Sequence, residues 1–488
     1  MQTAHVPLDA AAPISPAEQT PYLWTITLVA AMGGLLFGYD WVVIGGARQF
    51  YEAYFHLNSE QLVGWANSSA LVGCFLGSLA AGYLGNPFGR RRLLLVSAIL
   101  FSISSGLTGW SYSFSTFIFW RIVGGIAIGL SSNISPLYIA EISPASVRGR
   151  LVSLNQFAIV VGILLAQVAN WQISRPIPDH ISRTAFLQTW NVQYGWRWMF
   201  CAVVVPAVVF TVMSLFIPES PRWLLARGRD DEAYEVLKRV GGLPYALSEV
   251  PAIKKNLQLE AGMQTSWKEL YLAGMRRIVL IGVALAVLQQ WTGINILFNY
   301  AAEVYRSAGY GDNDILLNIV ITGAINLVFT VLAMLIVDRV GRRPMMLFGC
   351  IGIGLSHLLS AMAYHARWHS SAILVLTLSA IACYALTLAP VTWVLISEIF
   401  PNRIRSQAVS VAVCALWIAS FALTYTFPLI NRKLGSSGTF LGYGGICMLG
   451  AIFVLAFVPE TKGRTLEKIE ASLLSPGSKT ALDSSGLK

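Results

Sequence analysis

The chain is 488 residues long and carries a net charge of +10, and 55% of its residues are hydrophobic while only 12% are charged. Soluble domains have about twice that share of charged residues, so a soluble protein of this composition would expose large apolar surfaces to water. The composition therefore excludes a soluble enzyme and a soluble nucleic-acid-binding protein.

The N-terminal stretch 1–21 contains four prolines but no Lys or Arg. It lacks the basic region with which a signal peptide begins. We expect a disordered tail over 1–21, followed from Tyr22 by an apolar segment that stays in the membrane.

Apolar windows long enough to cross a hydrocarbon core of about 30 Å recur along the chain. Twelve spans are predicted, at 22–46, 61–84, 92–111, 114–140, 151–173, 197–217, 277–301, 315–337, 344–365, 371–397, 406–430 and 438–458. The predicted fold class is an all-α integral membrane protein with twelve transmembrane helices in two six-helix, pseudo-symmetric bundles. The bundles comprise 22–217 and 276–458, a cytoplasmic helical linker over 218–275 joins them, and 459–488 is a cytoplasmic tail.

The Lys and Arg residues fall mostly on one side of these spans. That side holds 25 of the 34, and the opposite side holds seven. Because positively charged loops stay in the cytoplasm, both termini and the linker are predicted to be cytoplasmic, at the inner membrane if the cell is bacterial. The positive charge thus reports topology, and no nucleic-acid partner is needed to explain it.

The predicted linker balances eight Lys or Arg against eight Asp or Glu. Its segments Asp230–Val240 and Ala252–Ala261 combine helical spacing with mixed charge, which favours short helices. A solvated linker without helices is the alternative.

The two halves carry the same short motifs at matching positions. A Gly-Arg-Arg turn follows the second and the eighth spans, and a Glu seven residues before an Arg follows the fourth and the tenth: Gly89-Arg90-Arg91, Gly341-Arg342-Arg343, Glu141 with Arg148, and Glu398 with Arg405. Two related halves joined by a loop are what a transporter with rocking bundles requires.

These motifs predict a charge network at the cytoplasmic ends of the spans. Glycine permits a tight turn, and the arginines can reach carboxylates or the carbonyls at helix C-termini. We expect Glu141 to pair with Arg148, and Glu398 with Arg405, and so to hold the halves together when the inner side is closed. The alternative is that the arginines only set the topology.

Two opposite charges lie deep inside predicted spans. Asp40 stands within the first span and Arg121 within the fourth. An ionised side chain at mid-bilayer costs on the order of 2.5–3.5 kcal/mol, so each needs a partner. A carboxylate that alternates between an arginine and a proton is a plausible coupling device, and a static ion pair is the alternative.

A set of amide and tryptophan side chains also lies in the spans: Gln156, Gln167, Gln289, Gln290, Asn295, Asn299, Asn326, Trp393 and Trp417. In the seventh span, Gln289 and Asn295 fall within a sector of one helix face. Amides that donate and accept, next to indole faces, suit a neutral polyhydroxylated ligand. The scarcity of charge in this set argues against an ionic substrate. Hydrogen bonding between helices is the alternative role.

The remaining reactive side chains indicate no enzyme. His357, His365 and His369 lie in or just beyond the ninth span, away from any nucleophile or full metal set, and are interpreted as packing or outer-surface residues. The six cysteines lack the spacing of a metal site, which predicts free thiols, no metal and no cofactor.

The chain resembles the sugar porter family of the major facilitator superfamily over about residues 22–465. The motifs that carry the resemblance are Arg90-Arg91, PESPRWL at 218–224, Gln289-Gln290 with Gly293 to Asn295, Asp338 with the second Gly-Arg-Arg turn, and PETKG at 459–463. Within that family, the chain is most similar to bacterial proton-coupled symporters of the D-xylose type.

The resemblance implies roles for individual positions. Asp40 matches the proton-coupling carboxylate and Arg121 its partner. The positions that match the sugar site are Gln156, Gln289, Gln290, Asn295, Asn326, Trp393 and Trp417. The positions that match the gate and the inner charge network are Asn299, Tyr300, Arg90, Arg91, Glu141, Arg148, Asp338, Arg342, Arg343, Glu398 and Arg405.

Several positions depart from the family pattern. Asn299 replaces the first of two gate tyrosines, while Leu416, Ser420 and Ile163 stand where relatives carry amides. The first cytoplasmic turn has Asn86-Pro87 in place of the usual aspartate and arginine, which predicts a weaker inner lock in that half. Because Leu416, Ser420 and Ile163 offer fewer hydrogen bonds to a sugar than amides would, the sugar specificity of the relatives does not carry over to this chain.

The predicted function is proton-coupled symport of a monosaccharide by alternating access, with the lipid bilayer as surroundings and a monomer as the working unit. One alternative is a facilitative uniporter for a monosaccharide or a polyol such as inositol. A sugar sensor without transport is disfavoured, because the short C-terminal tail has no recognisable output domain.

Overall fold

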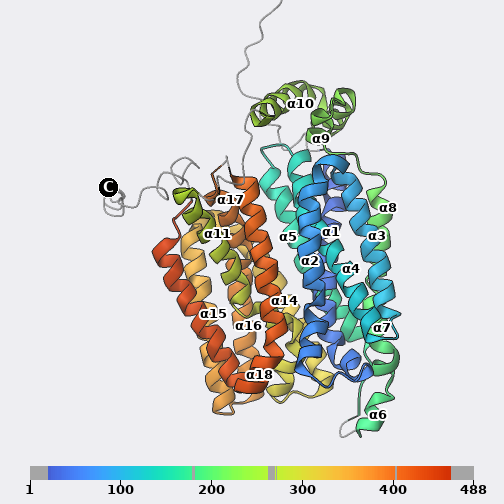
Figure 1. The fold of residues 1–488 in the computed structure, drawn as a ribbon, viewed down its shortest axis with the longest axis vertical. Helices are drawn as coiled ribbons and strands as arrows, with labels where there is room; N and C mark the ends of the chain where they lie inside the picture. Colours follow the sequence, from blue (N-terminus) through green and yellow to red (C-terminus); the bar gives the residue numbers. More distant parts are fainter. Residues whose placement is uncertain (1–19, 179–181, 262–269, 271, 402–403, 463–488) are drawn as a thin grey trace, which may run out of the picture.

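The computed structural model describes residues 20–178, 182–261, 270, 272–401 and 404–462. Within these residues the secondary structure is helical, and the helices form two bundles side by side with a layer of further helices over one end (Figure 1). We call the end that carries α9 and α10 the linker end, and the end that carries α6 the distal end.

The first bundle is built from five long helices and a segmented sixth span. The long helices are α1 (Pro21–Tyr54), α2 (Glu60–Phe88), α3 (Arg90–Gly109), α4 (Phe114–Ile142) and α5 (Arg148–Ile173). The sixth span consists of α6 (Arg183–Leu187), a π-helical turn (Asn191–Gly195), α7 (Trp196–Cys201) and α8 (Val204–Ser214).

The first helix is longer than predicted, because it continues to Tyr54 and not to residue 46. The extension contains Arg48 and Glu52, whose charges argue against a membrane window. The two side chains are one helical turn apart and pair with each other at 2.5 Å, which neutralises both.

Glycine brings the helices of this bundle into close contact. A Cβ atom on Gly125 of α4 would lie 1.9 Å from the carbonyl oxygen of Ala70, and one on Gly73 of α2 would lie 2.0 Å from that of Ile122. Backbones this close have no room for a side chain, as in other membrane helix pairs with small residues at the contact.

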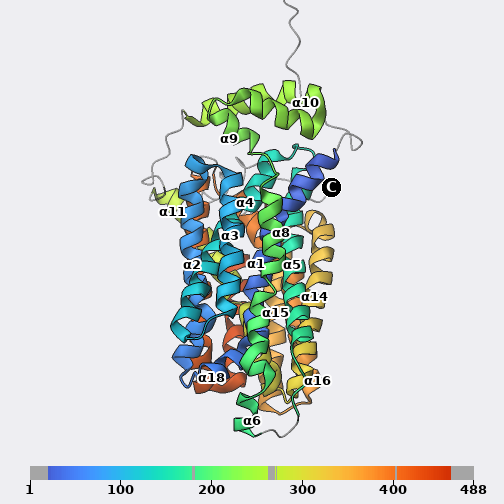
Figure 2. The ribbon, with the colours of Figure 1, turned by 90° about the vertical axis from the view of Figure 1, so that its right-hand side faces the viewer.

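Two linker helices lie across the end of the first bundle (Figure 2). They are α9 (Pro221–Ala226) and α10 (Asp230–Ala261), the latter broken at Gly242, where φ is +83°. The Trp223 indole donates to the Asn86 carbonyl, and the Thr20 hydroxyl donates to the Arg239 carbonyl of α10. The linker is therefore attached to the first bundle at two points, one at Asn86 of α2 and one at Thr20, just before α1.

The second bundle repeats the arrangement with more breaks. Its helices are α11 (Ala273–Trp291), α12 (Ile294–Asn299), α13 (Ala301–Ser307), α14 (Asp312–Val340), α15 (Arg342–His365), α16 (Ser370–Leu386), α17 (Leu388–Ile399) and α18 (Arg405–Phe457). Eleven described helices are long and apolar enough to cross a membrane. The last of them, α18, is interrupted at Gly435, where φ is +67°. Counting its two arms separately gives twelve spans.

Large apolar side chains cover the outside of both bundles, among them Val205, Phe216, Leu335 and Ile452, each more than half exposed. Such a surface is stable only against lipid. The chain is a multi-pass membrane protein.

Candidate functional site

The first bundle contains a buried ion pair halfway along α1. The Arg121 guanidinium of α4 donates from Nη1 to both carboxylate oxygens of Asp40, at 3.1 and 3.2 Å, and each residue is 2% exposed. Behind it, the guanidinium carbon of Arg121 lies 5.5 Å from the centre of the Phe200 ring. The structure thus brings together the two charges that the sequence singled out, in surroundings where neither tolerates losing the other.

The second bundle presents a chain of amides where its first span is broken. Gln290 Nε2 donates to Gln289 Oε1 at 3.2 Å, and Asn295 Nδ2 donates to Gln290 Oε1 at 2.6 Å and to Ser420 Oγ at 3.1 Å. All three amides are at least nine-tenths buried. The group is polar, uncharged and connected across α11, α12 and α18.

The break corrects the predicted seventh span, which was a continuous helix over 277–301. The chain leaves the helix after Trp291 and re-enters it at Ile294, because Gly293 adopts φ +83°, a conformation that glycine takes without strain. α12 is therefore a separate short helix. Asn295 donates to Gln290 across the break, instead of lying with Gln289 on one face of a continuous helix.

A histidine supports this break. His357 Nε2 of α15 lies 2.8 Å from the Thr292 carbonyl oxygen, and the Cys447 thiol approaches the same oxygen at 3.9 Å. That carbonyl has lost its helical partner, because the Ile296 amide donates to Gly293 instead. His357 was expected to be a packing residue; it also partners the backbone oxygen freed by the break.

All six cysteines are free, as predicted.

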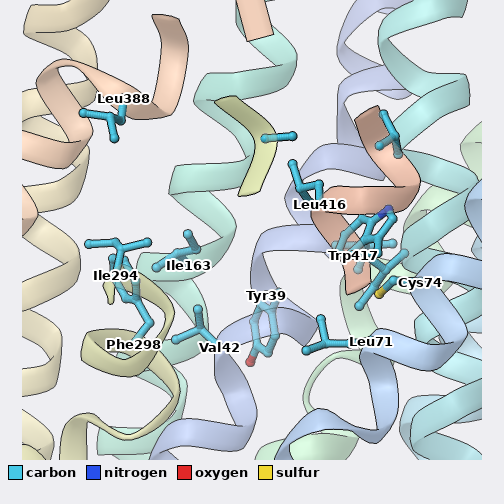
Figure 3. Packing of buried hydrophobic residues seen from close by; sticks show 14 of the residues in the cluster. Tyr39, Val42, Leu71, Cys74, Ile163, Ile294, Phe298, Leu388, Leu416 and Trp417 are labelled. Carbon is cyan, nitrogen blue, oxygen red and sulfur yellow. The ribbon is translucent and has the colours of Figure 1, made fainter. Parts of the chain in front are cut away.

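The tryptophans and outlying amides have different surroundings. Trp417 is buried between the bundles, its indole donates to Ser78 Oγ of α2 at 2.8 Å, and it lies near Leu71 and Cys74 (Figure 3). Trp393 is 41% exposed, so much of its indole is not covered by protein.

The remaining amides lie on the facing helices α5 and α14. Asn326 of α14 is buried, while Gln156 of α5 is half-buried. Gln167 packs against Gly323, where a Cβ would lie 1.8 Å from its amide oxygen, so it belongs to the contact between the bundles.

At the linker end, the carboxylate of the first bundle has a different partner from the one predicted. Glu141 pairs with Arg90 of the Gly-Arg-Arg turn at 2.8 Å and accepts from the Ser220 hydroxyl, while the exposed Arg148 donates to the Ser143 carbonyl at 3.4 Å. Arg91 donates to the Leu215 carbonyl at the end of α8. Glu141 and Arg148 do not pair in this conformation; the pair was predicted for the state in which the inner side is closed, and it stays a prediction.

The second bundle repeats this pattern. Glu398 lies 3.4 Å from Arg342, and Arg343 donates to the Leu455 carbonyl. Arg405 donates to the Phe400 carbonyl. Glu398 and Arg405 likewise do not pair in this conformation, and their pairing stays a prediction for the state in which the inner side is closed. Here Arg148 and Arg405 each donate to a carbonyl five residues earlier. Asp338 lies in α14, but its side chain is outside the described residues.

Two further glutamates were missed from the sequence. Glu219 accepts the backbone amides of Arg90 and Arg91, and Glu460 accepts those of Arg342 and Arg343. Each caps the positive N-terminus of the helix after a Gly-Arg-Arg turn. The sequence signal that could have identified them is the Pro-Glu pair that follows the last span of each half.

The distal end is where the bundles meet through charges. Asn299 and Tyr300 are both buried, and the Tyr300 hydroxyl donates to the Thr424 carbonyl at 2.7 Å. Arg48 of α1 lies 2.7 Å from Glu303 of α13. Two ion pairs cross between the bundles at this end, Arg48–Glu303 and Arg432–Glu60, whereas Arg90–Glu141 and Arg342–Glu398 at the linker end each lie within one bundle.

Comparison with known proteins gives this geometry a family context. The family model described as "Sugar (and other) transporter" matches residues 26–473. The chain is 38% identical over 481 residues to the D-xylose-proton symporter of Escherichia coli K12, covering 92% of this chain and 95% of the relative. It is 36% identical over 480 residues to the major myo-inositol transporter of Bacillus subtilis, covering 96% and 97%.

Solved structures agree with the sequence comparison. The inward open conformation of the xylose transporter XylE from E. coli matches with a TM-score of 0.81 at 37% identity, over 92% of this chain and 99% of that chain. At this identity the likeness extends from the fold to the family.

Proposed function

We propose that this chain, which belongs to the sugar transporter family, couples the passage of a monosaccharide to that of a proton by alternating access between its two bundles. The observation that carries the proposal is the buried Asp40–Arg121 pair in one bundle, together with the uncharged amide chain of the other. The first bundle would handle the proton, and the second would supply most of the contacts to the sugar.

The amide chain suits a neutral ligand with several hydroxyl groups. Gln289, Gln290 and Asn295 bond to one another and to Ser420, so each can exchange an internal bond for one to a sugar hydroxyl. The uncovered indole of Trp393 offers a face for the C–H side of a sugar ring. Gln156 and Asn326, on the facing helices α5 and α14, would complete the ring of polar groups.

Proton coupling is a consequence of the pairing of Asp40. While ionised, the carboxylate is held by Arg121; when it takes up a proton, the attraction is lost and Arg121 is left to other partners. This exchange gives the first bundle two discrete arrangements, which is what coupling requires. Trp417, bonded to Ser78 of the other bundle, would transmit the change across the interface.

The Lys and Arg distribution supports a cytoplasmic linker end with both termini inside, at the inner membrane of a bacterial cell. The distal end is then extracellular, and its charged contacts close the outer side in this conformation. Because one chain contains both bundles, a monomer suffices for transport.

A facilitative transporter for a sugar or a polyol is the second candidate. Leu416 and Ile163 offer no hydrogen bonds where amides were expected, and a myo-inositol transporter is among the relatives. This version keeps the site and makes the Asp40–Arg121 pair static.

Uptake into proteoliposomes separates the two candidates. A labelled panel of xylose, glucose, galactose, arabinose, fructose and inositol would be offered with an inward proton gradient, with and without a protonophore. The proposal expects one sugar to accumulate above the external concentration and to stop doing so with the protonophore. Equilibration that is indifferent to the protonophore would identify a facilitator.

A further inference from the structure

We infer that Arg48, Glu52 and Glu303 form a reversible lock on the distal side, in which one arginine is shared between a carboxylate of its own helix and a carboxylate of the other bundle. The inference rests on the proposed function, because it assigns these residues to the closing of the outer side. Arg48 is a positioning residue: it holds α1 against α13 and acts on the sugar site through that contact.

The contacts of Arg48 reach both bundles. It lies 2.5 Å from Glu52, one turn further along α1, and 2.7 Å from Glu303 of α13. Its guanidinium carbon also lies 4.3 Å from the centre of the Tyr300 ring. Tyr300 comes directly after α12, the helix that carries Asn295, so the lock and the amide chain are connected through one short segment.

The arginine is more deeply buried than its two carboxylate partners. The Arg48 side chain is 9% exposed, whereas those of Glu52 and Glu303 are 21% and 31% exposed. A cavity of about 500 Å³, lined in part by Gln49, Glu52 and Arg306, lies beside Glu52. Water can therefore reach the carboxylates while the arginine stays covered.

This arrangement makes the lock easy to open. When α1 and α13 separate, Glu52 moves with Arg48, so the arginine keeps one partner and is never a lone buried charge. Glu303 keeps the Asn431 amide, which donates to it at 2.6 Å, and gains water. A single pair between the bundles would cost more to break, because both charges would lose their partner at once.

The two glutamates therefore have opposite effects on the same equilibrium. Removing the charge of Glu303 weakens only the closed state, so Glu303→Gln favours the outward-open conformation. Removing the charge of Glu52 takes away the partner that Arg48 retains when open, so Glu52→Gln favours the closed conformation. A merely structural role predicts that both changes act in the same direction.

Hydrogen exchange of the full chain in lipid nanodiscs tests this without sugar or proton gradient. We expect amides of 46–54 and 294–307 to exchange about five-fold faster or more in Glu303→Gln, and more slowly in Glu52→Gln, than in the unmodified protein. Arg432→Gln is the matched control, because Arg432 also pairs across the bundles, with Glu60, but is 71% exposed; it should change little.

Shifts of the same sign in both glutamate variants, or no shift in either, would overturn the lock. Arg48→Met should exchange faster, as Glu303→Gln does. If the Arg48→Met protein does not fold, the two glutamate variants alone decide the question. The readout is independent of transport, so the lock can fail while symport stands, and symport can fail while the lock stands.

Discussion

The two bundles have the same scaffold at the linker end and different chemistry at the centre. In both, a Gly-Arg-Arg turn is capped by a glutamate, Glu219 or Glu460, and pairs with a second carboxylate. At mid-membrane, the first bundle holds a buried ion pair and the second an uncharged amide chain. The repeat has kept its framework, while the two centres differ: one is a buried ion pair and the other is an uncharged amide chain.

The largest effect is expected from the charged half. Asp40→Asn removes the titrating group but keeps the size of the side chain, so the proton has no carrier while the sugar site is intact. Uphill accumulation of the sugar should disappear, and exchange of labelled for unlabelled sugar should persist. Both are measured in the same proteoliposomes, and a variant that still concentrates sugar would contradict the division.

The amide half should fail in a different way. Asn295→Ala removes the amide that we propose exchanges its internal bonds to Gln290 and Ser420 for a bond to a sugar hydroxyl. Losing that bond to the sugar costs about 1–3 kcal/mol of binding free energy, which corresponds to roughly a 5- to 150-fold rise in KM. Accumulation at saturating sugar should remain coupled. Loss of coupling with an unchanged KM would show that the two functions are not separated in this way.

A smaller effect is expected from His357, which touches neither half of the site directly. His357→Ala leaves the Thr292 carbonyl short of its main partner and loosens the break that aims Asn295, so KM should rise by about five-fold, or roughly 1 kcal/mol. His357→Gln restores a donor and should recover most of the affinity. Equal KM values for the two variants would mean that the hydrogen bond to the Thr292 carbonyl does not position the site.

The smallest effects should be alike in both bundles. Glu219→Gln and Glu460→Gln each remove the charge of a helix cap, which costs about 0.5–1 kcal/mol of stability. Thermal unfolding in detergent measures both, and similar losses would confirm that the scaffold is shared. A large loss in one variant alone would show that the two turns have diverged as the centre has.

The cost of placing polar groups in a membrane made the central residues predictable from the sequence. Asp40 and Arg121 were expected to meet because neither charge is tolerated alone, and the amides stood out for a similar reason. The break at Gly293 was missed, since a glycine within an apolar window has no local signature of its positive φ. The pairs of Glu141 with Arg90 and of Glu398 with Arg342 were missed because sequence proximity favours Arg148 and Arg405, whereas the folded turns bring Arg90 and Arg342 close in this conformation.

The most direct test of the central claim is proton movement driven by sugar alone. Proteoliposomes loaded with a pH-sensitive dye, and held without an initial pH gradient, would receive the sugar that the uptake panel identifies. We expect the lumen to acidify as sugar enters, and Asp40→Asn to abolish the acidification while labelled sugar still equilibrates. Sugar entry without any change in lumenal pH in the unmodified protein would contradict it and make the Asp40–Arg121 pair a structural one.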